Sequence, residues 1–267
     1  MKTLFCMAVF VATAVAAIAA DPLVEFTLQD GSKFVGSAHW MPVKKEYEVS
    51  RKTGSGGTAI TALTPAQVKG IRVQAPENWK DTMEKVRAGE TTQSITALNA
   101  IMKDYSMLDY DILAASTLVR IYLRLNRVDD AMRVVDDLMF IRPNAASETE
   151  AAPAIWAAWV ASKKTARLES SLTDAIQKGP RKVAAQALIM RGDTLMKADG
   201  RERERNALKD GYLRAILLFK DVREVQPEAL HKAALAFDAL QEVHYAERMR
   251  QTLLRDYAES DYAKGLR

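Results

Sequence analysis

The most informative segment of the sequence is Ser116–Pro143, STLVRIYLRLNRVDDAMRVVDDLMFIRP. Its apolar residues recur every three or four positions, which places them on one face of an α-helix. Asn126 stands near the middle and Pro143 at the end, so the stretch predicts two helices joined by a short turn. Small side chains let two antiparallel helices approach closely, and an aromatic ring fills the wedge at their crossing. The residues expected in this contact are Leu118, Val119, Tyr122, Ala131, Val135 and Leu138.

The same pattern recurs on both sides of this stretch. A second unit ends at Pro180 and a third at Pro227, so the successive intervals from Pro143 are 37 and 47 residues. The longer interval contains Gly200–Asn206, which predicts a longer turn or a helix extension. A fourth unit ends near Ala258, and a degenerate unit opens the series. The residues expected in the contacts of these units are Ile95, Leu98, Ile101, Met102, Tyr105, Ile155, Trp156, Trp159, Leu168, Leu172, Ala175, Leu188, Gly192, Leu195, Ala215, Phe219, Val222, Leu230, Ala233, Ala234, Phe237, Ala246 and Leu253.

This spacing resembles the tetratricopeptide repeat over about residues 79–262. The resemblance implies an α-solenoid, in which helical hairpins stack and their first helices line a concave face. Residues 227–264 are also similar to the final unit of exported bacterial repeat proteins that serve envelope assembly. An irregular helical domain without superhelical stacking is the alternative.

The sequence before residue 76 has the alternation of β-strands. Val24, Phe26 and Leu28 alternate with polar residues, and Asp30-Gly31 then predicts a hairpin with a type I′ turn. Three further strands are expected at 33–40, 46–51 and 58–61, then a capped helical turn at 64–68 and a last strand at 70–73. Five strands with one helical turn before the last resemble a small SH3-like barrel, whose closure removes most exposed strand edges.

The composition changes from strand-formers to helix-formers at Ala75-Pro76-Glu77. We therefore predict an α+β, mainly α protein: a five-stranded β-barrel in residues 21–76, followed by an α-solenoid of tetratricopeptide-like hairpins in residues 77–267.

Residues 1–20, MKTLFCMAVFVATAVAAIAA, have the pattern of a secretory signal peptide. Lys2 precedes an apolar run that ends in small residues, and cleavage could follow Ala19 or Ala20. The leader contains Cys6, the only cysteine, so the mature protein is expected to lack disulfides, a thiol nucleophile and cysteine-ligated metals. The leader predicts export to the periplasm. Secretion, or anchoring by an uncleaved leader, is the alternative, and no membrane span is expected after the leader is removed.

Charge is nearly balanced along the chain, with 38 Lys and Arg against 34 Asp and Glu. Such a small net charge produces no strong field to attract phosphates, so nucleic acid is not expected as a partner.

No pattern typical of a catalytic, cofactor or metal site is present. His39, His231 and His244 lack the spacing of zinc ligands. The run Gly54–Gly57 is not followed by Gly-Lys-Ser/Thr, so it predicts a hairpin loop and not a phosphate-binding loop. We expect no cofactor, no metal and no catalytic residues.

Two other groups of residues have a structural explanation. Acidic pairs such as Asp109 and Asp111 are expected on solvated faces or in the first turns of helices, since they do not form a shared carboxylate dyad. Trp156 and Trp159 are expected in the core.

The remaining candidate site is the surface of the first helices, where a peptide or a partner helix could bind. The resemblance implies that these non-core positions form a partner-binding groove: Arg120, Arg124, Gln186, Asp193, Lys197, His231, Leu235 and Asp238. We therefore expect a non-catalytic scaffold or adaptor for protein partners of the cell envelope, of unspecified oligomeric state. A regulatory or substrate-presenting subunit of an envelope enzyme or transporter is the first alternative. An enzyme with a site between barrel and repeats is the second.

Overall fold

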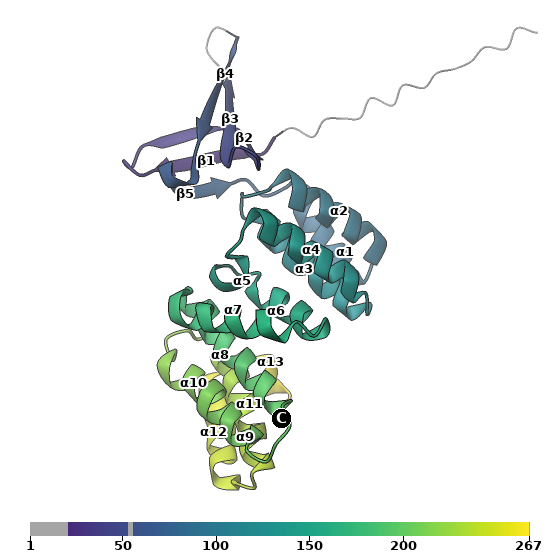
Figure 1. Cartoon of the computed structure of the whole chain (residues 1–267), viewed down its shortest axis with the longest axis vertical. Coiled ribbons are helices and arrows are strands. Elements are labelled where there is room, and N and C mark those ends of the chain that lie inside the picture. Colours follow the sequence, from purple (N-terminus) through teal and green to yellow (C-terminus); the bar gives the residue numbers. More distant parts are fainter. Residues whose placement is uncertain (1–20, 53–55, 267) are drawn as a thin grey trace, which may run out of the picture.

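The computed structural model describes residues 21–52 and 56–266, which form an antiparallel sheet followed by helices (Figure 1). The predicted leader, and Gly54 and Ser55 of the glycine-rich run, lie outside the described residues. The sheet has the order β4-β3-β2-β1-β5. Its elements are β1 (Leu23–Leu28), β2 (Lys33–Met41), β3 (Glu46–Lys52), β4 (Thr58–Leu63), the single turn η1 (Pro65–Gln67) and β5 (Val68–Val73). The five predicted strands and the helical turn are confirmed.

The two halves of β2 pair with different neighbours. Residues 33–37 of β2 pair with β1, whereas residues 37–41 pair with β3. Gly36 lies beside this change of partner, and a Cβ atom there would lie 2.6 Å from the carbonyl oxygen of Ser50. Only glycine therefore permits this close approach of β2 to β3.

The β1–β2 hairpin forms at Asp30-Gly31, but its turn is not of type I′. A type I′ turn needs positive φ at both central residues, and of this pair only Gly31 has it, at 84°. The Gly31 N–H donates to the Leu28 carbonyl at 3.0 Å, and the Ser32 N–H donates to the Asp30 carboxylate at 2.8 Å. The loop is longer than a two-residue turn, and the Asp30 carboxylate caps it. The Asp-Gly pattern alone did not distinguish this capped loop from a type I′ turn.

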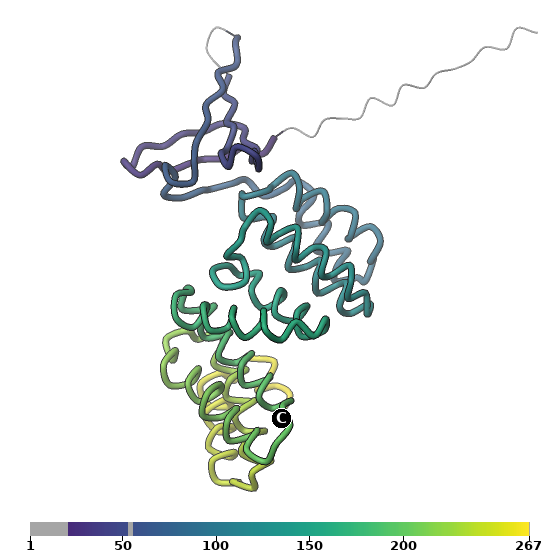
Figure 2. The backbone as a smooth tube through the Cα atoms, viewed as in Figure 1, coloured from purple at the N-terminus to yellow at the C-terminus, as the bar shows by residue number. Residues whose placement is uncertain are grey.

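The helices follow one another as antiparallel pairs away from the sheet (Figure 2). They are α1 (Trp79–Ala88), α2 (Thr91–Asp104), α3 (Tyr110–Arg124), α4 (Val128–Ile141), α5 (Ala145–Glu148), α6 (Ala152–Ala161), α7 (Thr165–Lys178), α8 (Arg181–Met196), α9 (Arg203–Ala207), the π-helical segment η2 (Leu208–Tyr212), α10 (Leu213–Leu218), α11 (Gln226–Ala239), α12 (Val243–Asp256) and α13 (Asp261–Lys264). Of the described residues, none belongs to a helix with the length and apolar character needed to cross a membrane.

Four inter-helix turns have the same geometry. Gly89, Asn126, Lys163 and Gln241 each follow a helix with positive φ, between 57° and 81°. In each turn the next residue donates its N–H to a carbonyl five residues earlier, as Arg127 does to Tyr122 at 2.8 Å. This is the hydrogen bond of a Schellman motif. The first three turns lie at intervals of 37 residues, so the same turn conformation recurs at a constant spacing.

The third hairpin departs from this geometry and from part of the prediction. Its second helix runs through α9, η2 and α10 and ends at Leu218, so Phe219 and Val222 lie in the following loop. Both side chains are nevertheless buried. Pro227 stands in the first turn of α11, where a missing N–H has no helical partner to lose. This proline therefore begins a helix and does not close the third unit.

The sheet and the helices share a core. Leu108, in the loop between α2 and α3, is fully buried among sheet residues, and Ile141 of α4 packs against the same cluster. The Tyr47 hydroxyl of β3 donates to the Met107 carbonyl at 3.1 Å. In the same region, the Arg142 guanidinium donates two hydrogen bonds to the buried Asp111 carboxylate, at 2.8 and 3.0 Å. The prediction of Asp111 as a first-turn helix residue is confirmed, but this carboxylate is not solvated.

Candidate functional site

All but one of the predicted groove residues lie on first helices of the hairpins. Arg120 and Arg124 lie on α3, Gln186 and Asp193 on α8, and His231, Leu235 and Asp238 on α11, whereas Lys197 is the residue that follows α8. Of these residues, Asp193 contacts a further side chain, Lys232 of α11, that the sequence did not single out.

Lys232 connects the third and fourth hairpins. Its ammonium donates to the Asp193 carboxylate of α8 and to the Glu228 carboxylate of its own helix, each at 2.6 Å. The side chains of Lys232 and Asp193 are 23% and 27% exposed. One cation therefore binds two carboxylates at a surface that remains accessible to a partner. We call Asp193, Tyr212, Glu228 and Lys232 the α8–α11 cluster.

Tyr212 is the fourth member of the cluster. Its hydroxyl donates at 2.8 Å to Oδ1 of Asp193, whereas Lys232 donates to Oδ2. Its ring lies where a Cβ atom on Gly192 would be, and a Cβ on Gly211 would lie 2.6 Å from the Gly192 Cα. The two glycines let η2 approach α8 closely enough for this hydrogen bond to form. A π-helical turn, which often marks a functional site, sets the direction of Tyr212.

The titration of the cluster follows from its burial and its charges. Burial raises the pKa of the Tyr212 hydroxyl, and the neighbouring Asp193 carboxylate raises it further. Burial by itself would lower the pKa of Lys232, but its hydrogen bonds to Asp193 and Glu228 raise that pKa above its ordinary value. Tyr212 therefore stays a neutral donor and Lys232 a cation at physiological pH.

The surroundings of the cluster are mixed in character. His231 stacks obliquely on Tyr262 of α13, with ring centroids 5.3 Å apart, and burial lowers the pKa of this histidine. Asp238 forms an ion pair with Arg250 of α12. Leu235 is half exposed. The face can offer hydrogen bonds of both kinds and one apolar contact, which suits recognition of a peptide or a helix more than chemistry on a small molecule.

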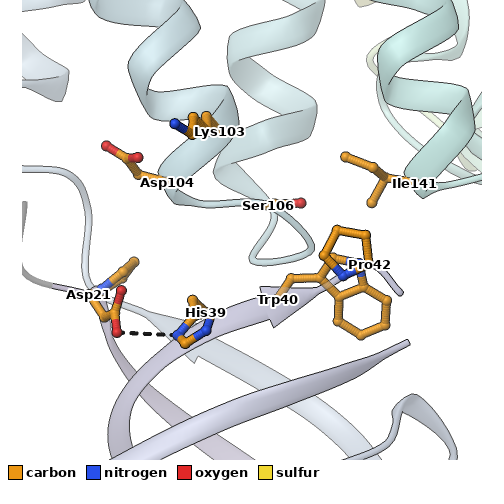
Figure 3. Close-up of a pocket in the computed structure, with 9 residues that line it drawn as sticks. Asp21, His39, Trp40, Pro42, Lys103, Asp104, Ser106 and Ile141 are labelled. Atoms are coloured by element: carbon orange, nitrogen blue, oxygen red, sulfur yellow. Dashed lines mark hydrogen bonds and ion pairs between the residues drawn. The ribbon is translucent and has the colours of Figure 1, made fainter. Parts of the chain in front are cut away.

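A second candidate site is the pocket between the sheet and the helices (Figure 3). It has a volume of about 440 Å³ and includes Asp21, His39 and Ser106. His39 faces Asp21, with 3.3 Å between Nδ1 and the carboxylate, and its Nε2 lies 3.2 Å from the Met41 sulfur. The buried Ser106 hydroxyl has no hydrogen-bond partner. A serine nucleophile is ordinarily activated by a base within hydrogen-bond reach, and no hydrogen bond joins Ser106 to His39.

The two tryptophans and His244 pack against other side chains. Trp156 is fully buried and its indole N–H donates to Ser171 at 3.0 Å, and Trp159 is 2% exposed. Both predictions of core tryptophans are confirmed. His244 lies against the Tyr245 ring. Within residues 21–52 and 56–266, no group of three or more His, Cys, Asp or Glu residues is arranged to hold a metal ion.

The sequence contained only part of the signal for the α8–α11 cluster. Glu228 and Lys232 are four residues apart on one helix, a spacing that predicts their ion pair. The contact between Asp193 and Lys232 spans 39 residues, and the position of Tyr212 depends on the π-helical turn. Neither follows from helical periodicity.

Comparisons of the chain with models of protein families, with characterised proteins and with solved structures give no match.

Proposed function

We propose that the chain is an exported, non-catalytic adaptor that binds a protein partner of the bacterial cell envelope on the face formed by α8 and α11. The observation that carries the proposal is the ion pair between Asp193 and Lys232, which joins two first helices and leaves each side chain about a quarter exposed. The pattern of residues 1–20 supports export.

The repeated turns support a tetratricopeptide-like array. Positions 89, 126 and 163 have the same conformation at equal spacing, and position 241 repeats it one hairpin after the irregular third. Hairpins with equal turns can stack with similar rotations, and such stacking builds an extended surface from the first helices. In the proposed array, the predicted groove residues on α3, α8 and α11 would contribute to this surface.

The strand order and the shared strand β2 support an SH3-like barrel as a second module. The two halves of β2 pair with different neighbours, and η1 precedes the last strand. Its core is completed by Leu108 from the helices, so the module is held at a set position relative to the groove.

Substitutions of two exposed leucines test the proposal. Leu235 is 51% exposed on the proposed face, and Leu217 is 70% exposed on α10. The purified protein, immobilised and exposed to envelope extract, is expected to retain one stoichiometric partner. Leu235→Arg should lose this partner and Leu217→Arg should retain it, with unchanged circular dichroism in both variants. Equal retention by both variants would exclude the α8–α11 face.

The identity of the partner distinguishes an adaptor from a regulatory subunit. An adaptor links two proteins and leaves their rates unchanged. If the captured partner is an enzyme or transporter whose rate changes on addition of the purified chain, the protein is a regulatory or substrate-presenting subunit instead.

A further inference from the structure

The two edge strands of the sheet differ in how they are protected. The edge strand β5 carries Lys69 and Arg72, and such charges oppose pairing with another strand. The other edge strand, β4, has the sequence TAITAL, with no charge and no proline. Its central residue Ile60 is 63% exposed. An uncharged edge with an exposed β-branched residue is ready to pair with a further strand.

The position of β4 makes this edge accessible. Figure 1 shows β3 and β4 projecting away from the helices, whereas β5 runs beside them. The opposite side of β4 is fully paired with β3, from Lys52 and Thr58 to Tyr47 and Leu63. The strand therefore has a defined, extended conformation before any partner arrives, which lowers the entropic cost of pairing.

We propose that the occupant of this edge is a second copy of the chain, paired antiparallel through β4 about a two-fold axis at Ile60. In an antiparallel ladder, opposed residues direct their backbone groups to the same edge, so they differ by an even number of positions. An axis at Ile60 satisfies this condition. It places Ile60 opposite Ile60 of the second copy, and Ala59 opposite Thr61, and all the opposed pairs along the strand are uncharged.

This register differs from its neighbours in how it arranges the charges of β3, although these charges lie three strand spacings, about 14 Å, apart and contribute little energy. Lys52 pairs with Thr58, and Glu48 pairs with Ala62. An axis at Ile60 sets Thr58 opposite Ala62 of the second copy. One row across the four strands then begins at Lys52 of one copy and ends at Glu48 of the other. Shifting the axis by one residue in either direction removes this row of opposite charges. The two-fold symmetry forms the row twice.

The contact is expected to be weak. Six residues per strand form a small interface, well below the area of about 1,000 Å² that a stable association needs. The dimer should therefore form only at high protein concentration and dissociate on dilution.

Sedimentation equilibrium of the purified chain tests the association. We expect a reversible monomer–dimer equilibrium that Ile60→Lys abolishes, because two ammonium groups would be directly opposed. Val35→Lys is the matched control, since Val35 is also exposed but belongs to the interior strand β2. It should dimerise as the original chain does. A chain that stays monomeric at every concentration, or an Ile60→Lys variant that still dimerises, would overturn the proposal.

Cross-linking tests the register. The sequence has one cysteine, Cys6, so Ile60→Cys in a Cys6→Ser background adds the only thiol. Opposed residues in an antiparallel pair have Cα atoms about 4.5 to 5.5 Å apart, which a disulfide can bridge. Ile60→Cys should oxidise to a covalent dimer and Val35→Cys should not. Equal rates for both would overturn the register. Protection of Ile60→Cys only when a different protein binds would overturn the second copy in favour of a partner's strand.

Discussion

Two of the ion pairs that join distant parts of this chain differ in burial. Arg142 binds Asp111 across 31 residues, with side-chain exposures of 16% and 2%. Lys232 binds Asp193 across 39 residues, with exposures of 23% and 27%. The first lies beside the loop that enters the core of the sheet, and the second lies on the open face of α8 and α11.

The same kind of contact can therefore serve two purposes. A charge removed from water must be compensated within the protein, so the buried Asp111–Arg142 pair stabilises the region where the sheet meets the helices and is not accessible to a partner. The Asp193–Lys232 pair stays partly solvated, so a partner can compete for its hydrogen bonds at a modest cost.

Breaking the buried pair should have the largest effect on stability. Asp111→Ala leaves the Arg142 guanidinium and the Met107 N–H without their main acceptor. We expect the free energy of unfolding to fall by about 3 to 5 kcal/mol, as measured by urea denaturation. The matched control is Asp136→Ala, which removes an exposed pair with Arg167 and should cost less than about 1 kcal/mol. Equal losses would mean that burial does not distinguish the two pairs.

Adding a side chain at Gly211, where η2 packs against α8, should have the next largest effect. Gly211→Ala places a Cβ atom 2.6 Å from the Gly192 backbone, which cannot move without separating the two helices. We expect a loss of about 3 kcal/mol in unfolding free energy, together with loss of the Tyr212 contact to Asp193. Gly70→Ala is the control, because no atom lies within 4 Å of its added Cβ. A neutral Gly211→Ala would show that the hairpin tolerates repacking.

Loss of the Asp193–Lys232 pair should have the smallest of these three effects, and the effect should depend on pH. The pKa of Lys232 is raised above 10.5 in the folded chain. Its contribution, about 1 to 2 kcal/mol, is therefore complete below about pH 10 and is lost as the pH rises through the folded-state value. Thermal melting of the original chain and of Lys232→Met should differ near neutral pH and converge in alkali. A difference that persists after the lysine has lost its proton would assign the stabilisation to packing.

The local patterns predicted most of the elements. The alternation of Val24, Phe26 and Leu28 located β1, and the contact residues of the second unit, including Trp156 and Leu172, are all buried. These predictions succeed because a period of two or 3.6 residues reports directly on which side of an element is covered. The sequence around Asn126 also predicted its turn, since asparagine tolerates positive φ.

The differences from the predictions have two physical causes. The loop type at Asp30 depended on a side-chain hydrogen bond, and the end of α10 at Leu218 depended on packing that buries Phe219 outside a helix. Asp111 lies in the first turn of a helix, as one of the two predicted positions, but its burial depends on Arg142, 31 residues away. The Asp30 contact is local but is not reported by hydrophobic periodicity, whereas the burial of Phe219 and Asp111 depends on segments outside the window that periodicity samples.

The amino-acid order was enough to locate the change from strands to helices and the covered side of most elements. Those properties depend on the order of apolar and polar side chains within a few turns of chain. The fold was needed to show that Leu108 completes the core of the sheet, that Lys232 meets Asp193 and that the uncharged strand β4 lies at an edge of the sheet. Those properties depend on contacts between segments that are distant in the chain, and chain folding alone brings them together.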